Sequence, residues 1–249
     1  MLAARALDGL PEIAAGDDLA ALIAAAAGGL ADGEVVVVAH KAVSKAEGRV
    51  RRLAEVEPGA QARELAAAHG KDPRHVQVVL DESRALLRAE RGVLVCETHH
   101  GLVCANAGVD ASNAAEPGTV ILLPEDPDAS ARALRARLRE LTGAAPGVLV
   151  ADSFGRAWRH GQVDVAIGAA GIAPLEDWRG RADATGRELR ATWIAVADAI
   201  AAAADLARAK DSRQPVVVVR GVERLVLAAG EDGPGAAALR RPADEDLFR

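Results

Sequence analysis

The stretch Glu34-Val-Val-Val-Val-Ala39, followed at once by the polar segment His40-Lys-Ala-Val-Ser-Lys-Ala-Glu-Gly-Arg49, decides the fold class. A short run of branched apolar residues is typical of a buried strand. Other apolar runs that predict strands lie at 93–96, 102–104, 119–123, 147–151 and 216–219. Because their spacing is irregular and helical segments lie between them, the chain predicts an α+β or mixed α/β fold with mixed sheets, rather than a regular doubly wound sheet.

Two of the predicted helices have marked N-termini. Asp17-Asp18 open an Ala/Leu-rich helix that runs to about residue 27, since acidic residues suit the positive N-terminus of a helix. Asp126 is a candidate N-cap before Pro127. The other expectations are a helix over 61–69, an extended segment over 76–80, outward-facing Arg132, Arg135 and Arg137, and a long Ala-rich C-terminal helix, the longest of the chain, over about 186–210.

The composition excludes several classes of protein. The chain has 249 residues, of which 50% are hydrophobic, so it has enough apolar surface to offset the entropy of folding. Its net charge of −6 argues against non-specific binding to nucleic acid, which needs a basic face. No apolar run has the length of a membrane span, and the N-terminus lacks a signal-peptide pattern. We therefore expect a cytoplasmic protein with no nucleic-acid or membrane partner.

The domain organisation is predicted from the one linker-like segment. Gly230-Glu-Asp-Gly-Pro-Gly235 is rich in glycine and acid, and it lies near the end of the chain. We expect residues 1–229 to form one module, with two subdomains as an alternative whose boundary the sequence does not mark. Residues 230–249 are expected to form a loosely held tail.

The first candidate site is the segment 40–49. Lys41, Lys45 and Arg49 leave a buried strand together with a serine, and such a cluster can bind phosphate. The segment lacks the order of residues of a Walker loop. The alternative interpretation is the solvated start of a helix.

Two more polar segments follow predicted strands. Asp110 and Asn113 come after a strand and a glycine, and their oxygens suit a hard cation or a phosphate, although the same residues are common in turns. Asp152 and Ser153 supply two further oxygens, and Arg156 with its neighbour Arg159 can bind anions. This combination is what chemistry on a magnesium–nucleotide complex needs.

One group of residues suggests a zinc site. Cys96, His99, His100 and Cys104 are four possible ligands within a predicted hairpin. Their spacing matches no familiar zinc motif, and the alternation of side chains along strands can send them to opposite faces. We expect buried thiols and hairpin histidines here, not structural zinc.

Taken in order, these motifs resemble the coenzyme F-420-0:γ-glutamyl ligase family, in its single-module form without the C-terminal nitroreductase-like domain. The resemblance covers nearly the whole chain and rests on Gly9-Leu-Pro-Glu-Ile13, Gly16-Asp-Asp-Leu19, Val43-Ser-Lys-Ala-Glu-Gly-Arg49, His100-Gly-Leu-Val-Cys-Ala-Asn-Ala-Gly-Val-Asp110, Ser112-Asn113, Leu123-Pro-Glu-Asp-Pro-Asp128, Ser130-Ala131, Asp152-Ser-Phe-Gly-Arg156, Trp158-Arg159, Gly161-Gln162, Asp183, Gly186-Arg187 and Pro215 through Gly221.

The resemblance implies a GTP-dependent ligase of deazaflavin cofactor biosynthesis. In the implied reaction the carboxylate of F-420-0 is joined to the amino group of L-glutamate, and γ-linked glutamates are then added. The family implies a homodimer that uses Mg²⁺ or Mn²⁺, and also K⁺. Carried over residue by residue, the GTP contacts are Leu10, Pro11, Glu12, Ile13, His40, Lys45, Asn113 and Lys210, and the metal ligands are Asp110, Asp152 and Ser153.

Two positions depart from the family's pattern. His40 stands where relatives often have a small hydroxyl residue, and its ring can still donate to phosphate. Ala209, before Lys210, stands where relatives usually have a glycine in a nucleotide-binding loop. The individual contacts over 208–214 are therefore less well defined than the others.

The chemistry of amide formation agrees with the resemblance. A carboxylate does not react with an amine at neutral pH, so GTP must first convert it to an acyl phosphate. Metal at Asp110 and Asp152 would neutralise the transferring phosphoryl group, while Lys45, Arg156 and Arg159 hold its oxygens. The alternatives are a non-catalytic GTP-binding regulatory homologue and an amide ligase with a different acyl acceptor.

Overall fold

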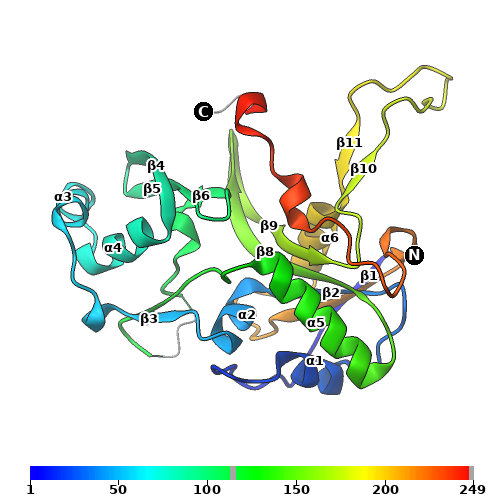
Figure 1. Cartoon of the computed structure of the whole chain (residues 1–249), viewed down its shortest axis with the longest axis horizontal. Helices are drawn as coiled ribbons and strands as arrows, with labels where there is room; N and C mark the ends of the chain where they lie inside the picture. The colour runs from blue at the N-terminus through cyan, green and yellow to red at the C-terminus, as the bar shows by residue number, and fades with distance from the viewer. Residues whose placement is uncertain (113–115, 247–249) are drawn as a thin grey trace.

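The computed structural model describes residues 1–112 and 116–246. Its centre is a five-stranded mixed sheet with the strand order β1-β12-β2-β8-β9 (Figure 1). Strand β2 is parallel to β8, whereas the β1–β12, β12–β2 and β8–β9 pairs are antiparallel. These strands are β1 (Ala3–Ala6), β2 (Val35–Ala39), β8 (Gly147–Arg156), β9 (Arg159–Ala170) and β12 (Val216–Arg220).

The four valines of β2 explain why this run forms a central strand. Val36 and Val38 are fully buried on one face of the sheet, and Val35 and Val37 on the other. The first face is covered by α1 (Leu19–Ala27), α2 (His40–Ala46) and α5 (Pro127–Thr142), and the second by α6 (Val196–Asp205). A strand that is buried on both faces has a continuous run of apolar residues in its sequence, as β2 does.

The start of α5 is held tightly against β9. Asp126 caps the helix by accepting a hydrogen bond from Ala129 N at 2.9 Å, and Pro127 occupies the first turn, as the sequence predicts. A side chain at Gly168 of β9 would place a Cβ only 2.2 Å from the Pro127 carbonyl oxygen. Only glycine permits this approach, and the first turn of α5 therefore lies directly on the sheet.

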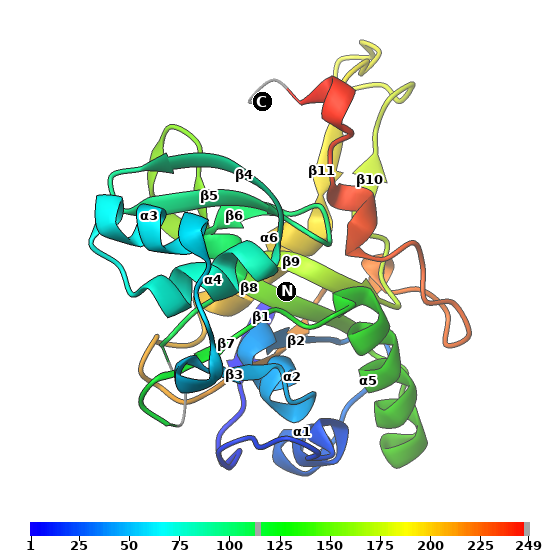
Figure 2. The ribbon, with the colours of Figure 1, turned by 60° about the vertical axis from the view of Figure 1, so that its left-hand side comes forward.

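A separate lobe lies to one side of the main sheet and has its own hydrophobic core (Figure 2). Its core includes Val76, Val79, Leu94 and Cys96, all fully buried. Between α2 and α5 the chain forms the α-helices and β-strands on this side of the molecule. They are β3 (Val50–Arg52), α3 (Ala60–His69), α4 (Pro73–Asp81), β4 (Ser83–Glu90), β5 (Val93–Thr98), β6 (Val103–Ala105) and β7 (Thr119–Ile121).

Two further segments extend from the sheet. The hairpin of β10 (Leu175–Asp177) and β11 (Trp193–Ala195) projects away from the main body, and both views show this (Figures 1 and 2). The C-terminal segment runs back over the sheet, where Asp128 of α5 accepts hydrogen bonds from the backbone N–H groups of Ala236 and Ala237. Within the described residues, no helix has the length and apolar character needed to cross a membrane.

Three local predictions are wrong. Residues 76–80 are the end of α4, because the cap Asp72 and Pro73 start a helix whose valines pack inward. The expected helix over 186–210 is shortened to α6, since residues up to 195 belong to the projecting hairpin; the longest described helix is α5. Arg135 is only 3% exposed and donates to the carbonyls of residues 146, 228 and 231.

Candidate functional site

Asp152 lies inside a strand, not after one as the sequence predicts. Strand β8 continues to Arg156 and forms a hairpin with β9, in which Asp152 is opposite Val165. Because side chains alternate along a strand, Asp152 faces the same side of the sheet as Val150, the side covered by α2. Ser153 faces the opposite side.

His40 is the partner of Asp152. The ring Nε2 of His40 lies 3.2 Å from Oδ1 of Asp152, and the ring is only 2% exposed. The other ring nitrogen, Nδ1, lies 3.5 Å from the hydroxyl of Ser44, one turn along α2. The Asp152 carboxylate also accepts a hydrogen bond from the backbone N–H of Ser153 at 2.8 Å. The first turn of α2 and the carboxylate of β8 therefore form one polar cluster beside the sheet.

Lys41, the next residue of α2, holds the second carboxylate. Its Nζ lies 2.6 Å from Oδ2 of Asp110 and 2.6 Å from the hydroxyl of Ser112. Burial alone would raise the pKa of Asp110, but the hydrogen bonds and charge of Lys41 and the bonds from Ser112 lower it below its usual value. Asp110 is therefore an anion at neutral pH, with an ammonium group as its present counter-ion. Asn113 lies outside the described residues.

The loop of residues 10–13 lies against the second turn of α2. Lys45 donates to Oε1 of Glu12 at 2.5 Å, with the lysine side chain 13% exposed and the glutamate 66%. Ile13 is buried in the main core and Leu10 packs against that core, so both anchor the loop, whereas Pro11 is exposed. The structure thus brings together the predicted nucleotide residues Glu12 and Lys45.

Ser153 belongs to a second cluster on the other face of the sheet. Its hydroxyl donates to Asp164 at 2.6 Å and accepts from Lys210 at 2.7 Å. Arg208 donates to the other oxygen of Asp164 at 2.5 Å. The predicted contact Lys210 therefore does meet Ser153, but the sheet separates this pair from Asp152.

The two arginines that the sequence places in the catalytic set lie at the hairpin tip. Arg156 pairs with Arg159 across the end of β8 and β9, and its guanidinium donates to the His160 carbonyl at 2.8 Å. At about 3.4 Å a residue, Arg156 is roughly 13 Å along the strand from Asp152. The structure thus does not bring these guanidinium groups to the carboxylate.

Of the four possible zinc ligands, the two cysteines are buried and the two histidines are hydrogen-bonded to backbone carbonyls. Cys96 and Cys104 are opposite each other in the β5–β6 pair and are both buried and free. Burial raises the pKa of the Cys104 thiol to about 12, and the charges of Asp152 and Cys96 add to this. His99 and His100 are hydrogen-bonded to backbone carbonyls of Asp81 and Pro124. Across residues 1–112 and 116–246, no three acidic, His or Cys side chains converge on a metal position.

Sequence reasoning missed Asp164 and Arg208. Asp164 is 1% exposed inside the otherwise apolar run from Val163 to Ile167. A buried carboxylate must be paired, so an isolated acid in an apolar strand was the signal that could have found this cluster. The sequence grouped Lys41 with the phosphate-binding residues, but nothing in its spacing showed that it would pair with Asp110.

Comparison with known proteins shows the family of the chain. The family model described as F420-0:Gamma-glutamyl ligase matches residues 9–221. A protein of Methanopyrus kandleri named Coenzyme F420:L-glutamate ligase is 48% identical over 94% of this chain and 92% of its own length. Proteins of the same name from Methanothermobacter thermautotrophicus and Archaeoglobus fulgidus are 43% and 45% identical, each over 98% of this chain and over 97% and 94% of their own lengths. The chain therefore belongs to the F420-0:γ-glutamyl ligase family.

Proposed function

We propose that this chain is a GTP-dependent ligase that joins L-glutamate to the carboxylate of coenzyme F420-0 through an acyl phosphate, and then adds further γ-linked glutamates. The observation that carries the proposal is the pairing of two carboxylates, Asp110 and Asp152, with consecutive residues of α2, Lys41 and His40. The relatives named Coenzyme F420:L-glutamate ligase support the choice of substrates.

The cationic side of the cluster supports the use of a nucleotide. Lys41 and Lys45 lie one turn apart on α2, and each binds a carboxylate. Both ammonium groups can exchange these partners for phosphate oxygens. The Glu12 side chain is 66% exposed, so water can solvate its carboxylate when Lys45 exchanges it for a phosphate oxygen.

A divalent cation fits the acidic side. Carboxylate oxygens are ligands that Mg²⁺ and Mn²⁺ prefer, and Mg²⁺ in nucleotide sites is commonly held by one or two carboxylates plus substrate phosphates. Asp110 and Asp152, the partners of the consecutive residues Lys41 and His40, can each supply such an oxygen, and the ammonium of Lys41 already occupies a cation position on Asp110. When bound, the metal would neutralise charge on the transferring phosphoryl group.

The chemistry then divides into two balanced steps. An oxygen of the F420-0 carboxylate attacks the γ-phosphorus, the bond to the β-phosphate oxygen breaks, and GDP leaves. The glutamate amine attacks the acyl carbon, the carbon–oxygen bond to phosphate breaks, and the amine proton is lost to solvent. Lys41 and Lys45 would hold phosphate oxygens, and His40, fixed by Asp152 and Ser44, would present its ring to the same region.

The test is whether nucleotide cleavage depends on both co-substrates. We expect GDP release over many turnovers only when F420-0 and L-glutamate are both present, with one GDP formed for each amide bond. GTP binding without any such release would instead favour a non-catalytic homologue. Coupled GDP release with another acyl acceptor, and none with F420-0, would favour a different amide ligase.

A further inference from the structure

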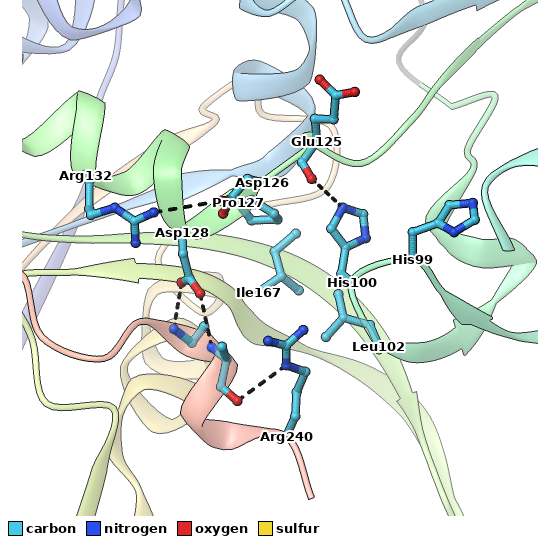
Figure 3. Close-up of a pocket in the computed structure, with 12 residues that line it drawn as sticks. His99, His100, Leu102, Glu125, Asp126, Pro127, Asp128, Arg132, Ile167 and Arg240 are labelled. Atoms are coloured by element: carbon cyan, nitrogen blue, oxygen red, sulfur yellow. Dashed lines mark hydrogen bonds and ion pairs between the residues drawn. The ribbon is translucent and has the colours of Figure 1, made fainter. Parts of the chain in front are cut away.

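A cavity of about 420 Å³ lies beside the first turn of α5 (Figure 3), and neither Asp110 nor Asp152 lines it. It lies where the β5–β6 hairpin, the start of α5, strand β9 and the C-terminal segment meet. The residues that line it are His99, His100, Leu102, Glu125, Asp126, Pro127, Asp128, Arg132, Ile167, Ala236, Ala237 and Arg240.

Two residues of the cavity wall lie close along the chain to residues beside Asp152. Ile167 is the unpaired residue at a bulge of β9, and Val165, two residues away on the same face, is opposite Asp152. Two residues of a strand span about 7 Å. Leu102 is likewise two residues from Cys104, whose thiol lies in the electric field of Asp152. Bulges are frequent next to active sites because they re-aim a side chain, and here Ile167 points into the cavity (Figure 3).

Two guanidinium groups face this cavity with much of their hydrogen-bonding capacity unused. Within the described residues, Arg240 makes one long bond, from Nε to the Ala237 carbonyl at 3.4 Å. Among residues 1–112 and 116–246, Arg132 has one side-chain contact, to Asp126 at 3.8 Å. The two groups come from different elements, and in Figure 3 Arg240 points toward the centre of the cavity from the C-terminal segment. Each guanidinium can bind a carboxylate through two parallel hydrogen bonds.

The acidic residues of the cavity have different roles. Asp128 is fully engaged, because it accepts hydrogen bonds from the backbone of Ala169, Ala236 and Ala237 and so holds the wall in place. Asp126 caps α5, and Glu125 lies at the rim. A triphosphate would meet these charges unfavourably. Two separate guanidiniums beside carboxylates instead match a small molecule with two carboxylates and one ammonium group.

We propose that this cavity is the binding site for the incoming amino acid, an α-amino dicarboxylic acid, with Arg240 and Arg132 holding its two carboxylates. The inference rests on the proposed function, in which L-glutamate is the nucleophile. The cavity is larger than one amino acid, which leaves room for the carboxylate end of the acceptor to reach the amine. Because Ile167 of its wall lies two residues along β9 from the residue opposite Asp152, the amine would be held on the side of the sheet where the acyl phosphate would form.

The test compares Arg240→Gln and Arg132→Gln with Arg241→Gln, the exposed neighbouring arginine that does not line the cavity. We expect each cavity variant to raise the KM for L-glutamate at least tenfold while the KM values for GTP and F420-0 stay within twofold. Arg240→Lys should recover part of the loss. The cavity variants should also lose much of the preference for L-glutamate over L-glutamine, which lacks one carboxylate. Arg241→Gln should match the wild type.

A binding measurement separates this inference from the proposed function. Equilibrium dialysis of radiolabelled L-glutamate, with a non-hydrolysable GTP analogue and Mg²⁺ present, requires no turnover. Weakened binding in Arg240→Gln supports the site even for a wild-type protein that forms no amide, which would defeat the proposed function alone. Unchanged glutamate binding and KM in both cavity variants, or an increase in the KM for F420-0 or GTP instead, would overturn the assignment.

Discussion

His40 and Asp152 meet at 3.2 Å because strands β2 and β8 run parallel in a fixed register. Ala39, the last residue of β2, is opposite Ala151 of β8, so His40 at the start of α2 and Asp152 within β8 are the next residues along the chain. Strand β2 ends at this point while β8 continues, so the first side chain of α2 lies beside a residue of the sheet. The strand-forming valines therefore determine the position of the site as well as the fold.

Replacing either carboxylate tests the site directly. Asp110→Asn and Asp152→Asn should each lose most of the ligase activity while the protein stays folded, because each removes a charge beside the transferring phosphoryl group. The expected cost is on the order of 2–4 kcal/mol in transition-state stabilisation. Steady-state kinetics at ordinary Mg²⁺ concentration checks it, with circular dichroism as the control for folding. Full activity in either variant would remove that residue from the site.

Nucleotide choice forms a second prediction. GTP should be preferred over ATP. Guanine presents two donors, N1–H and its exocyclic amine, to a protein acceptor such as the carboxylate of Glu12. Adenine presents no donor at these positions and leaves that acceptor unpaired. An unpaired buried acceptor costs about 1–3 kcal/mol, or more if charged. The ratio of kcat/KM values for the two nucleotides measures this in the wild type and in Glu12→Gln. Equal use of GTP and ATP by the wild type would contradict the expectation for the family, whereas unchanged preference in Glu12→Gln would exclude only that side chain.

The cysteine pair should not need zinc. We expect the double variant Cys96→Ser, Cys104→Ser to bind GTP and Mg²⁺ as the wild type does, because both thiols are buried and both neighbouring histidines bind carbonyls. Metal analysis of chelator-washed wild type should find no stoichiometric zinc. Zinc at one equivalent, with unfolding when it is removed, would show that a structural site exists.

Arg135 should matter for stability and not for the chemistry. Its buried guanidinium binds backbone carbonyls of the segment 228–231, and also Asp232. Arg135→Met would leave those buried acceptors unpaired, which we expect to cost roughly 3 kcal/mol of unfolding free energy. Denaturant unfolding measures the loss. The exposed Arg139, on the same helix, offers Arg139→Met as a control, which should change stability by less than about 1 kcal/mol.

The parts of the fold that could be predicted depend on local signals. The valines of β2, the start of α1 after Asp17-Asp18 and the cap Asp126 lie where the sequence predicts, since burial and helix-end signals act over a few residues. Arg135 could not be predicted as buried, because its carbonyl partners come from a distant part of the chain. The helix over 76–80 was missed because its apolar run fits a strand equally well when the preceding cap is overlooked.

The residues of the candidate site were likewise predictable where the signal is local, and not where it depends on the pairing of strands. Motif order identified Asp110, Asp152 and Lys45 as residues of one region, and the structure places them around α2 or beside it. The separation of Ser153 from Asp152 depends on strand β8 continuing past residue 151, which the polar sequence Asp152–Arg156 concealed. A polar strand end cannot be distinguished from a loop until its pairing with β9 is known.

The central claim is that GTP activates the F420-0 carboxylate before glutamate attacks it. The most direct measurement uses F420-0 labelled with ¹⁸O in that carboxylate, together with GTP and L-glutamate, and analyses both products by mass spectrometry. We predict that one labelled oxygen appears in the inorganic phosphate for each first amide, the one formed on the F420-0 carboxylate itself, whereas phosphate from later glutamate additions is unlabelled. Amide formation with only unlabelled phosphate, or no amide at all, would contradict the account.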